Sequence, residues 1–333
     1  MKLGLILHKE FPELSVAETK ILIEKFLNGR IINLTHNFVE AEISDNSKNL
    51  LTVLNRSAYI KKAIRLIAFA KNSAELEKEL LKGKLDFLKS EFTKPMKFRM
   101  TLENLEPTKQ SFANIISFGK ALAVYPFVGN VDLKNPELDF HILNSGKINL
   151  GILIWENKED FQSRRADKRP ANHPTSMSPR IARCLVNLTG AKSEVLDPFC
   201  GAGGFLIEAG IIGLNVYGSD IDFEMIERAK KNLAYFGVTA DLIVQDAILW
   251  IKSVEAVITD VPYGKSSKLN TSLDLLIKNF VRHYETLTKT IVLVYPDKIQ
   301  DGFLKGTSWK KMGEFSIYVH STLTRKIVIL KHN

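Results

Sequence analysis

Short apolar runs alternate with amphipathic segments through the second half of the chain. The runs at 195–199, 216–220, 240–246, 256–260 and 291–295 have the length and composition of buried strands. The segments at 203–212, 223–236 and 273–287 carry apolar residues at helical spacing. Two further strand-like runs, 314–320 and 325–330, have no helix between them. This order predicts an α/β domain with a doubly wound, mainly parallel sheet whose last two strands form an antiparallel hairpin.

The first half of the chain has a mixed pattern. Residues 1–45 read as a small α/β unit whose helix, 13–27, is followed by the stop signal Asn28-Gly29. Residues 46–150 contain expected helices at 57–70 and 112–124 and a basic strand at 97–101. A strand at 151–155 leads into a basic, Pro- and Ser-rich linker or ordered loop. We therefore expect one domain at 1–45, a second at 46–150, a linker at 151–175 and a C-terminal domain at 176–333.

The charge of the chain is positive and unevenly distributed. The net charge is +9, and residues 1–190 hold 29 Lys and Arg against 21 Asp and Glu, whereas residues 191–333 hold 17 against 16. This asymmetry favours a polyanion such as nucleic acid, engaged mainly by the first half. The chain has two cysteines and no metal-ligand spacing of histidines, so we expect no disulfide framework and no metal site. Without a signal peptide or a membrane-length apolar run, we expect a cytoplasmic protein.

A glycine-rich turn, DPFCGAGG at 197–204, follows the first strand of the C-terminal domain. Gly201 and Gly203 let the backbone approach a ligand, and the next helix directs its free N–H groups there. Asp220 ends the second strand, where it can bind ribose hydroxyls, and Asp246 ends the third, where it can meet an adenine amino group. With Asp197, these carboxylates would repel a pyrophosphate but suit a ligand with a cationic amino-acid part. They predict S-adenosylmethionine as the cofactor.

The fourth strand ends in the tetrapeptide Asp260-Val261-Pro262-Tyr263. This tetrapeptide resembles the [DN]-P-P-[YF] motif of amino-group methyltransferases. In that family the acidic or amide side chain and the next backbone carbonyl hold the target amine, and the aromatic ring stacks on the base. The resemblance implies catalytic roles for all four residues. Val261 stands where the family has a proline, so the loop lacks proline's fixed φ.

The identity of residue 260 bears on the substrate base. A carboxylate only accepts hydrogen bonds, and guanine presents two neighbouring donors, N1–H and N2–H. Adenine and cytosine pair a donor with an acceptor, so Asp260 favours guanine. An N6-adenine methyltransferase acting on DNA or RNA is the alternative enzyme. A non-catalytic RNA-binding subunit is a third hypothesis, which Val261 favours.

From about residue 163 to 267 the chain looks like the archaeal tRNA guanine N2-methyltransferases that modify position ten. The resemblance rests on RRADKRPANHPTSMSP, DPFCGAGG, YGSDID, NLAYFG and TDVPYGKSS. It implies a class I Rossmann-like methyltransferase domain preceded by α+β ferredoxin-like and THUMP RNA-binding domains. The implied partner is tRNA, with the target guanine flipped out of its stack towards Tyr263. Nothing in the sequence requires a membrane or a protein partner.

The resemblance also implies further site residues. The implied cofactor-binding residues are His173, Pro174, Met177, Asp197, Pro198, Phe199, Gly201, Gly203, Asp220, Ile221, Asp246, Ala247 and Asp260. The implied RNA-binding residues are Arg164, Arg165, Lys168, Arg169 and Lys265.

Overall fold

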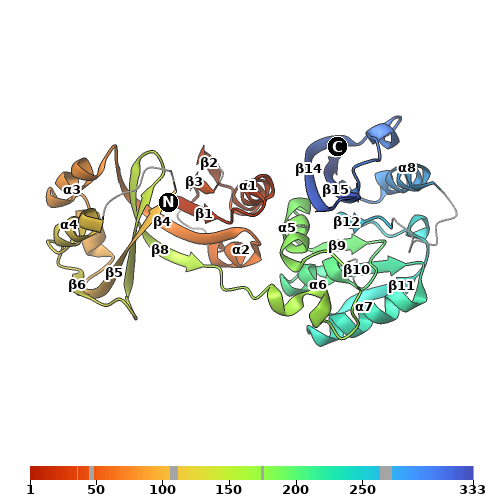
Figure 1. Cartoon of the computed structure of the whole chain (residues 1–333), viewed down its shortest axis with the longest axis horizontal. Helices are drawn as coiled ribbons and strands as arrows, with labels where there is room; N and C mark the ends of the chain where they lie inside the picture. Colours follow the sequence, from red (N-terminus) through yellow and green to blue (C-terminus); the bar gives the residue numbers. More distant parts are fainter. Residues whose placement is uncertain (36, 45–48, 106–111, 174–175, 263–271, 333) are drawn as a thin grey trace. The chain divides into compact units, whose positions relative to one another are not determined.

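The computed structural model describes residues 1–35, 37–44, 49–105, 112–173, 176–262 and 272–332 (Figure 1). The chain divides into two compact units. The first unit comprises residues 1–54 and 59–158, and the second comprises residues 55–58 and 159–333. The expected boundary at residue 45 lies outside the described residues, and the expected linker at 151–175 straddles the division between the units.

The first unit is built on one mixed sheet with the strand order β2-β3-β1-β4-β8-β7-β5-β6 (Figure 1). Its strands are β1 (Lys2–Leu7), β2 (Arg30–Leu34), β3 (Phe38–Glu42), β4 (Ile60–Ala70), β5 (Met96–Asn104), β6 (Val128–Val131), β7 (Leu138–Asn144) and β8 (Ile148–Glu156). Its helices are α1 (Pro12–Ile21), the π-helical η1 (Leu22–Phe26), α2 (Leu50–Arg56), whose last two residues belong to the second unit, α3 (Ser73–Leu81), the 3₁₀ turn η2 (Asp86–Ser90) and α4 (Phe112–Leu122). The mixed α/β expectation for this half is confirmed.

The prediction of a helix over residues 57–70 is wrong, because most of this segment forms the central strand β4, paired with β1 and β8. The register against β8 shifts between Ala63 and Ile64 and again between Leu66 and Ala68. Each shift interrupts the strict two-residue alternation of inward and outward side chains. Buried positions at Ile60, Ala63, Ile64 and Ala68 therefore recur at intervals that imitate a helix.

The second unit contains a sheet with the strand order β11-β10-β9-β12-β13-β15-β14. Its strands are β9 (Glu194–Asp197), β10 (Asn215–Asp220), β11 (Ala240–Val244), β12 (Ala256–Asp260), β13 (Thr290–Pro296), β14 (Lys310–His320) and β15 (Leu323–Lys331). Its helices are α5 (Pro179–Thr189), α6 (Gly204–Ile211), α7 (Phe223–Tyr235) and α8 (Leu273–His283), with short turns η3 (Gln162–Arg164), η4 (Ala166–Lys168), η5 (Ala247–Leu249), η6 (Tyr284–Thr286) and η7 (Asp301–Leu304).

The pairing of these strands confirms the predicted sheet. Strands β9 to β13 run parallel, whereas β15 is antiparallel to both β13 and β14. Strand β9 lies between β10 and β12, so the strand order reverses at β9. Parallel strands direct their carboxyl ends to one edge, which brings Asp197, Asp220 and Asp260 to the place where such sheets bind ligands.

Candidate active site

The loop between β9 and α6 depends on two glycines. Gly201 has φ of 49° and Gly203 has φ of 84°, both in the left-handed region that side chains disfavour. A Cβ atom on Gly201 would meet no atom within 4 Å, so this part of the loop faces open space. Helix α6 begins at Gly204, and the N–H groups of its first turn lie next to that space. Both positions thus need glycine for their backbone conformation, and the binding of a ligand at this loop stays a prediction.

Asp220 holds this loop in place. Its Oδ2 accepts a hydrogen bond from Gly201 N at 2.9 Å, and its Oδ1 accepts one from Asp222 N at 2.9 Å. Burial raises the pKa of Asp220. Asp222 itself caps the start of α7 by accepting from Glu224 N. Asp220 is therefore a support of the glycine loop as well as a candidate ligand for ribose hydroxyls.

Asp197 is enclosed at the end of β9. Thr259 Oγ1 donates to its Oδ1 at 2.7 Å, and Phe199 N donates to the same oxygen at 3.2 Å. Burial raises the pKa of Asp197 to about 8, against the opposing effect of the Thr259 hydrogen bond. The charges of Asp220 and Asp260 are smaller contributions to this raised pKa. A pKa of about 8 favours the protonated carboxyl group at neutral pH.

This protonation predicts a pH dependence of stability. In the unfolded chain the carboxyl titrates near 4, so between about pH 4 and 8 only the folded state holds this proton. The free energy of unfolding should consequently fall as pH rises through that window, by up to about 1.4 kcal/mol per pH unit from this group. Asp197→Asn removes this contribution. Denaturant unfolding at pH 5 and pH 8 should show a smaller loss for the variant than for the wild type, and equal losses would contradict the assignment.

The third carboxylate, Asp246, follows β11. Its Oδ1 accepts from Ile248 N at 3.1 Å and so caps the turn η5, in which Ala247 is buried. Ile221, directly after Asp220, has 73% of its surface exposed. An exposed isoleucine next to a carboxylate offers an apolar surface with a hydrogen-bond acceptor beside it, as an adenosine site requires.

The segment before His173 is fastened to the glycine loop by α7. Asn232 Oδ1 accepts from Ala171 N at 2.9 Å, and its Nδ2 donates to Ala171 O and Ala202 O, both at 3.0 Å. Arg228 Nη1 donates to Asn172 O at 2.6 Å. His173 follows this clamp, and its pKa is lowered by burial and by Arg228, against the opposing charge of Asp220. Met177 is buried, and Pro174 lies outside the described residues.

The predicted reaction loop begins at the end of β12. Asp260 is half-buried, and its Oδ2 lies 3.4 Å from Nη2 of Arg325 on β15. Val261 is buried, and its N–H donates to Val294 O on β13 at 3.1 Å. A proline could not make this hydrogen bond. The valine therefore fixes the loop by a backbone contact that the family's usual residue lacks. Pro262 is half-buried, and Tyr263, Lys265 and the rest of 263–271 lie outside the described residues.

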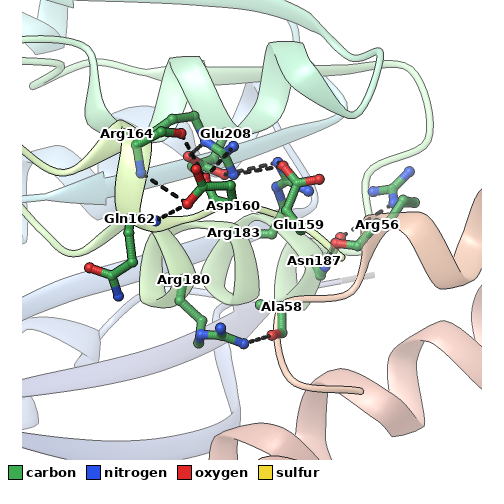
Figure 2. A network of polar contacts seen from close by, with 11 residues as sticks. Arg56, Ala58, Glu159, Asp160, Gln162, Arg164, Arg180, Arg183, Asn187 and Glu208 are labelled. Atoms are coloured by element: carbon green, nitrogen blue, oxygen red, sulfur yellow. Dashed lines mark hydrogen bonds and ion pairs between the residues drawn. The ribbon is translucent and has the colours of Figure 1, made fainter. Parts of the chain in front are cut away.

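Two of the expected RNA-binding residues are in the interior of the second unit. Arg164 Nε lies 2.7 Å from Oε1 of Glu208, and its Nη2 lies 2.8 Å from Oε1 of Glu159. Figure 2 draws these side chains together. Arg183 Nη2 binds the other oxygen of Glu208 at 2.9 Å. Arg169 is buried as well, and its Nε donates to Arg164 O at 2.9 Å.

The expectation of RNA contacts is therefore wrong for Arg164 and Arg169, because enclosed guanidinium groups cannot reach a phosphate. Arg165 and Lys168 are exposed and remain candidates. Within the same unit, Arg56 donates to Asn187 Oδ1 at 3.3 Å and to Ala191 O at 2.9 Å, and Arg180 donates to Ala58 O at 2.7 Å (Figure 2).

Arg325 and Asn232 are site residues that the sequence did not reveal. Arg325 lies opposite Pro296 in the β13–β15 pairing, far along the chain from Asp260. Asn232 begins the run NLAYFG, which was already part of the family resemblance. Its place in that run was the signal that the sequence offered for Asn232, and the sequence offered none for Arg325.

Comparison with known proteins gives a consistent result. Residues 166–325 match the RMKL-like methyltransferase domain family (UPF0020). A tRNA (guanine(10)-N2)-dimethyltransferase of Pyrococcus abyssi is 39% identical over 60% of this chain and 64% of its own length. The protein of the same name from Methanocaldococcus jannaschii is 29% identical, with 99% of each chain covered. The crystal structure of TrmN from Thermus thermophilus has a similar fold, with a TM-score of 0.53, 19% identity and coverage of 100% and 99%.

The extent of these matches differs between relatives. The alignment spans somewhat less than two thirds of the Pyrococcus abyssi protein and nearly all of the Methanocaldococcus jannaschii protein. Among the described residues, no helix combines the length and the apolar character needed to cross a membrane.

Proposed function

The chain belongs to the tRNA (guanine(10)-N2)-dimethyltransferase family, and on that premise we propose that it methylates the N2 amine of guanosine ten in tRNA. The observation that supports this activity best is the juxtaposition of two loops. Strand β12, which ends in Asp260, pairs directly with β9, which ends in Asp197 at the start of the glycine loop. The charge of Asp260 raises the pKa of Asp197, so the amine-holding loop adjoins the cofactor loop.

The residues around the glycine loop fit S-adenosylmethionine. Asp220 would accept hydrogen bonds from the ribose, Asp246 from the adenine amine, and Ile221 would contact the adenine ring. The left-handed Gly201 leaves open space where the methionine part would lie. Asp197, protonated while no ligand is bound, would lose its proton to stabilise a cationic group. When bound, S-adenosylmethionine supplies an electrophilic methyl group on its sulfonium.

The protein's own contribution is to position the amine. The Asp260 carboxylate would accept N2–H and N1–H of guanine, and the Val261 carbonyl would accept the second N2 hydrogen. This arrangement aims the nitrogen lone pair at the methyl group, and orientation alone can supply much of the rate. The proton that leaves N2 is already hydrogen-bonded to Asp260. Tyr263 would stack on the flipped base and hold it in the site.

The partner is tRNA, and the location we propose is the cytoplasm. The excess of Lys and Arg in residues 1–190 supplies phosphate contacts that would offset the cost of flipping the base. Arg165 and Lys168, exposed in the segment before the site, would extend this basic surface. Phosphate contacts of this kind weaken steeply with salt, so binding should as well.

Methyl transfer to an unmodified transcript tests the proposal. Purified protein, labelled S-adenosylmethionine and tRNA are incubated, and the RNA is then hydrolysed to nucleosides. We expect N2-methylguanosine or N2,N2-dimethylguanosine, both lost when guanosine ten is replaced by adenosine. Methyladenosine would overturn the proposed base. An absence of transfer, with measurable binding of cofactor and tRNA, would indicate a non-catalytic role.

A further inference from the structure

An arginine on β15, two strands away from β12 in the methyltransferase sheet, contacts the predicted catalytic carboxylate. Arg325 Nη2 lies 3.4 Å from Asp260 Oδ2, and the two side chains are 12% and 20% exposed. The contact exists because β15 runs antiparallel to β13 and places Arg325 opposite Pro296, beside the end of β12. Most of this ion pair is shielded from solvent, so its electrostatic effect is larger than that of a surface pair.

We propose that Arg325 is a positioning residue that keeps the Asp260 carboxylate ionised and oriented, and that it thereby sets the selectivity for guanine. This inference rests on the proposed function and concerns the same site. Arg325 acts through Asp260, because its guanidinium binds the carboxylate that faces the base.

The surroundings of Asp260 give Arg325 this role. Asp197, at the end of β9, is close enough to interact with the charge of Asp260, and Asp220 is the next carboxylate along the edge. Neighbouring carboxylates favour protonation of one another. On β13, the Tyr295 hydroxyl is bound to Asp301 at 2.6 Å, and Lys326 beside it pairs with Asp301 and Glu314. Arg325 is thus the cation that the described residues place on Asp260 itself.

The protonation state of Asp260 decides which base edge it matches. An ionised carboxylate offers two acceptors, which complement N1–H and N2–H of guanine. A protonated carboxyl offers one donor and one acceptor. That pair complements 2-aminopurine, which keeps the 2-amino group but has an acceptor at N1. Loss of Arg325 should consequently weaken discrimination between these two bases.

The experiment compares kcat/KM for two tRNAs that carry guanine or 2-aminopurine at position ten. The wild type should prefer guanine by roughly ten- to a hundredfold in kcat/KM. With 2-aminopurine, the unprotonated N1 of the base would face an oxygen of the ionised Asp260 carboxylate, and two acceptors form no hydrogen bond. Arg325→Gln should reduce this preference at least threefold, and Arg325→Lys should restore it. The acidic limb of the pH profile of kcat/KM for the guanine tRNA should lie at higher pH in Arg325→Gln than in the wild type, because removal of a nearby cation eases protonation of a carboxylate.

Lys326→Gln is the matched control, because it removes the same charge from the next residue of β15, which pairs elsewhere. It should leave both the preference and the pH profile unchanged. Binding of S-adenosylhomocysteine checks that each variant is folded, and Arg325→Leu replaces Arg325→Gln if the latter does not fold. If the wild type is active and the neutral variant of Arg325 keeps both the preference for guanine over 2-aminopurine and the pH profile, the role of Arg325 is overturned. The proposed function would then stand. A wild type that methylates neither base would instead overturn the proposed function.

Discussion

Replacement of Asp260 by alanine should lower kcat by roughly 100- to 1,000-fold and leave the dissociation constant of S-adenosylhomocysteine nearly unchanged. Asp260 lies at the end of β12, where its carboxylate would hold the amine. The glycine loop is supported instead by Asp220, which accepts a hydrogen bond from Gly201 N, and by Asn232, which donates one to Ala202 O. The variant should therefore lose the hydrogen bonds that orient the amine but keep the cofactor site.

Calorimetric binding of S-adenosylhomocysteine and single-turnover methylation of tRNA measure the two effects separately. Asp274→Ala is a suitable control, because Asp274 is an exposed carboxylate in the first turn of α8. It should leave both quantities as in the wild type. Joint loss of cofactor binding and turnover in Asp260→Ala would place Asp260 in the cofactor site and contradict the proposed division of roles.

Replacement of Glu208 by glutamine should destabilise the protein by roughly 3–5 kcal/mol. Glu208 on α6 is fully buried; its two oxygens accept from Nε and Nη2 of Arg164, and Oε2 also pairs with Nη2 of Arg183. Glutamine keeps the size of the side chain but removes the negative charge, so that among the described residues the two buried guanidinium groups share Glu159 as their remaining anion. An uncompensated charge in the interior is far more costly than a broken surface pair.

Guanidinium chloride unfolding of the wild type and Glu208→Gln measures this difference. Glu227→Gln is the matched control, since Glu227 pairs with Lys230 at 2.8 Å on the exposed side of α7. The control should change the free energy of unfolding by less than about 0.5–1 kcal/mol. A loss below 1 kcal/mol in Glu208→Gln would show that solvent already reaches this network.

The buried network also explains the ordered segment before the active site. Arg164 binds Glu208 on α6, and the buried Arg169 lies next to Gly204 at the start of the same helix. Asn232 then fastens Ala171 to the glycine loop. Two arginines of the basic run, Arg164 and Arg169, are consequently part of the interior of the methyltransferase domain, whereas Arg165 and Lys168 remain exposed.

Local sequence was sufficient for the methyltransferase sheet and for placing four candidate carboxylates at or just after the ends of its strands. The predicted strand 256–260 has the same bounds as β12, and the antiparallel final hairpin was also predicted correctly. Asp197, Asp220, Asp246 and Asp260 were found because each follows an apolar run that forms a strand. In a parallel sheet the ends of such runs meet at one edge, so their proximity follows from the order of elements alone.

Tertiary structure decided what depends on distant partners. Residues 60–70 carry a nearly helical pattern, yet they form β4 because β1 and β8 satisfy its backbone on both sides. Arg164 and Arg165 are neighbours in one basic run, but only Arg164 meets the buried Glu208. Arg325 reaches Asp260 through the pairing of β13 with β15. The physical reason is the same in each case: hydrogen-bond partners and counter-charges far along the chain, rather than neighbouring residues, determine whether a polar group is buried and what it binds.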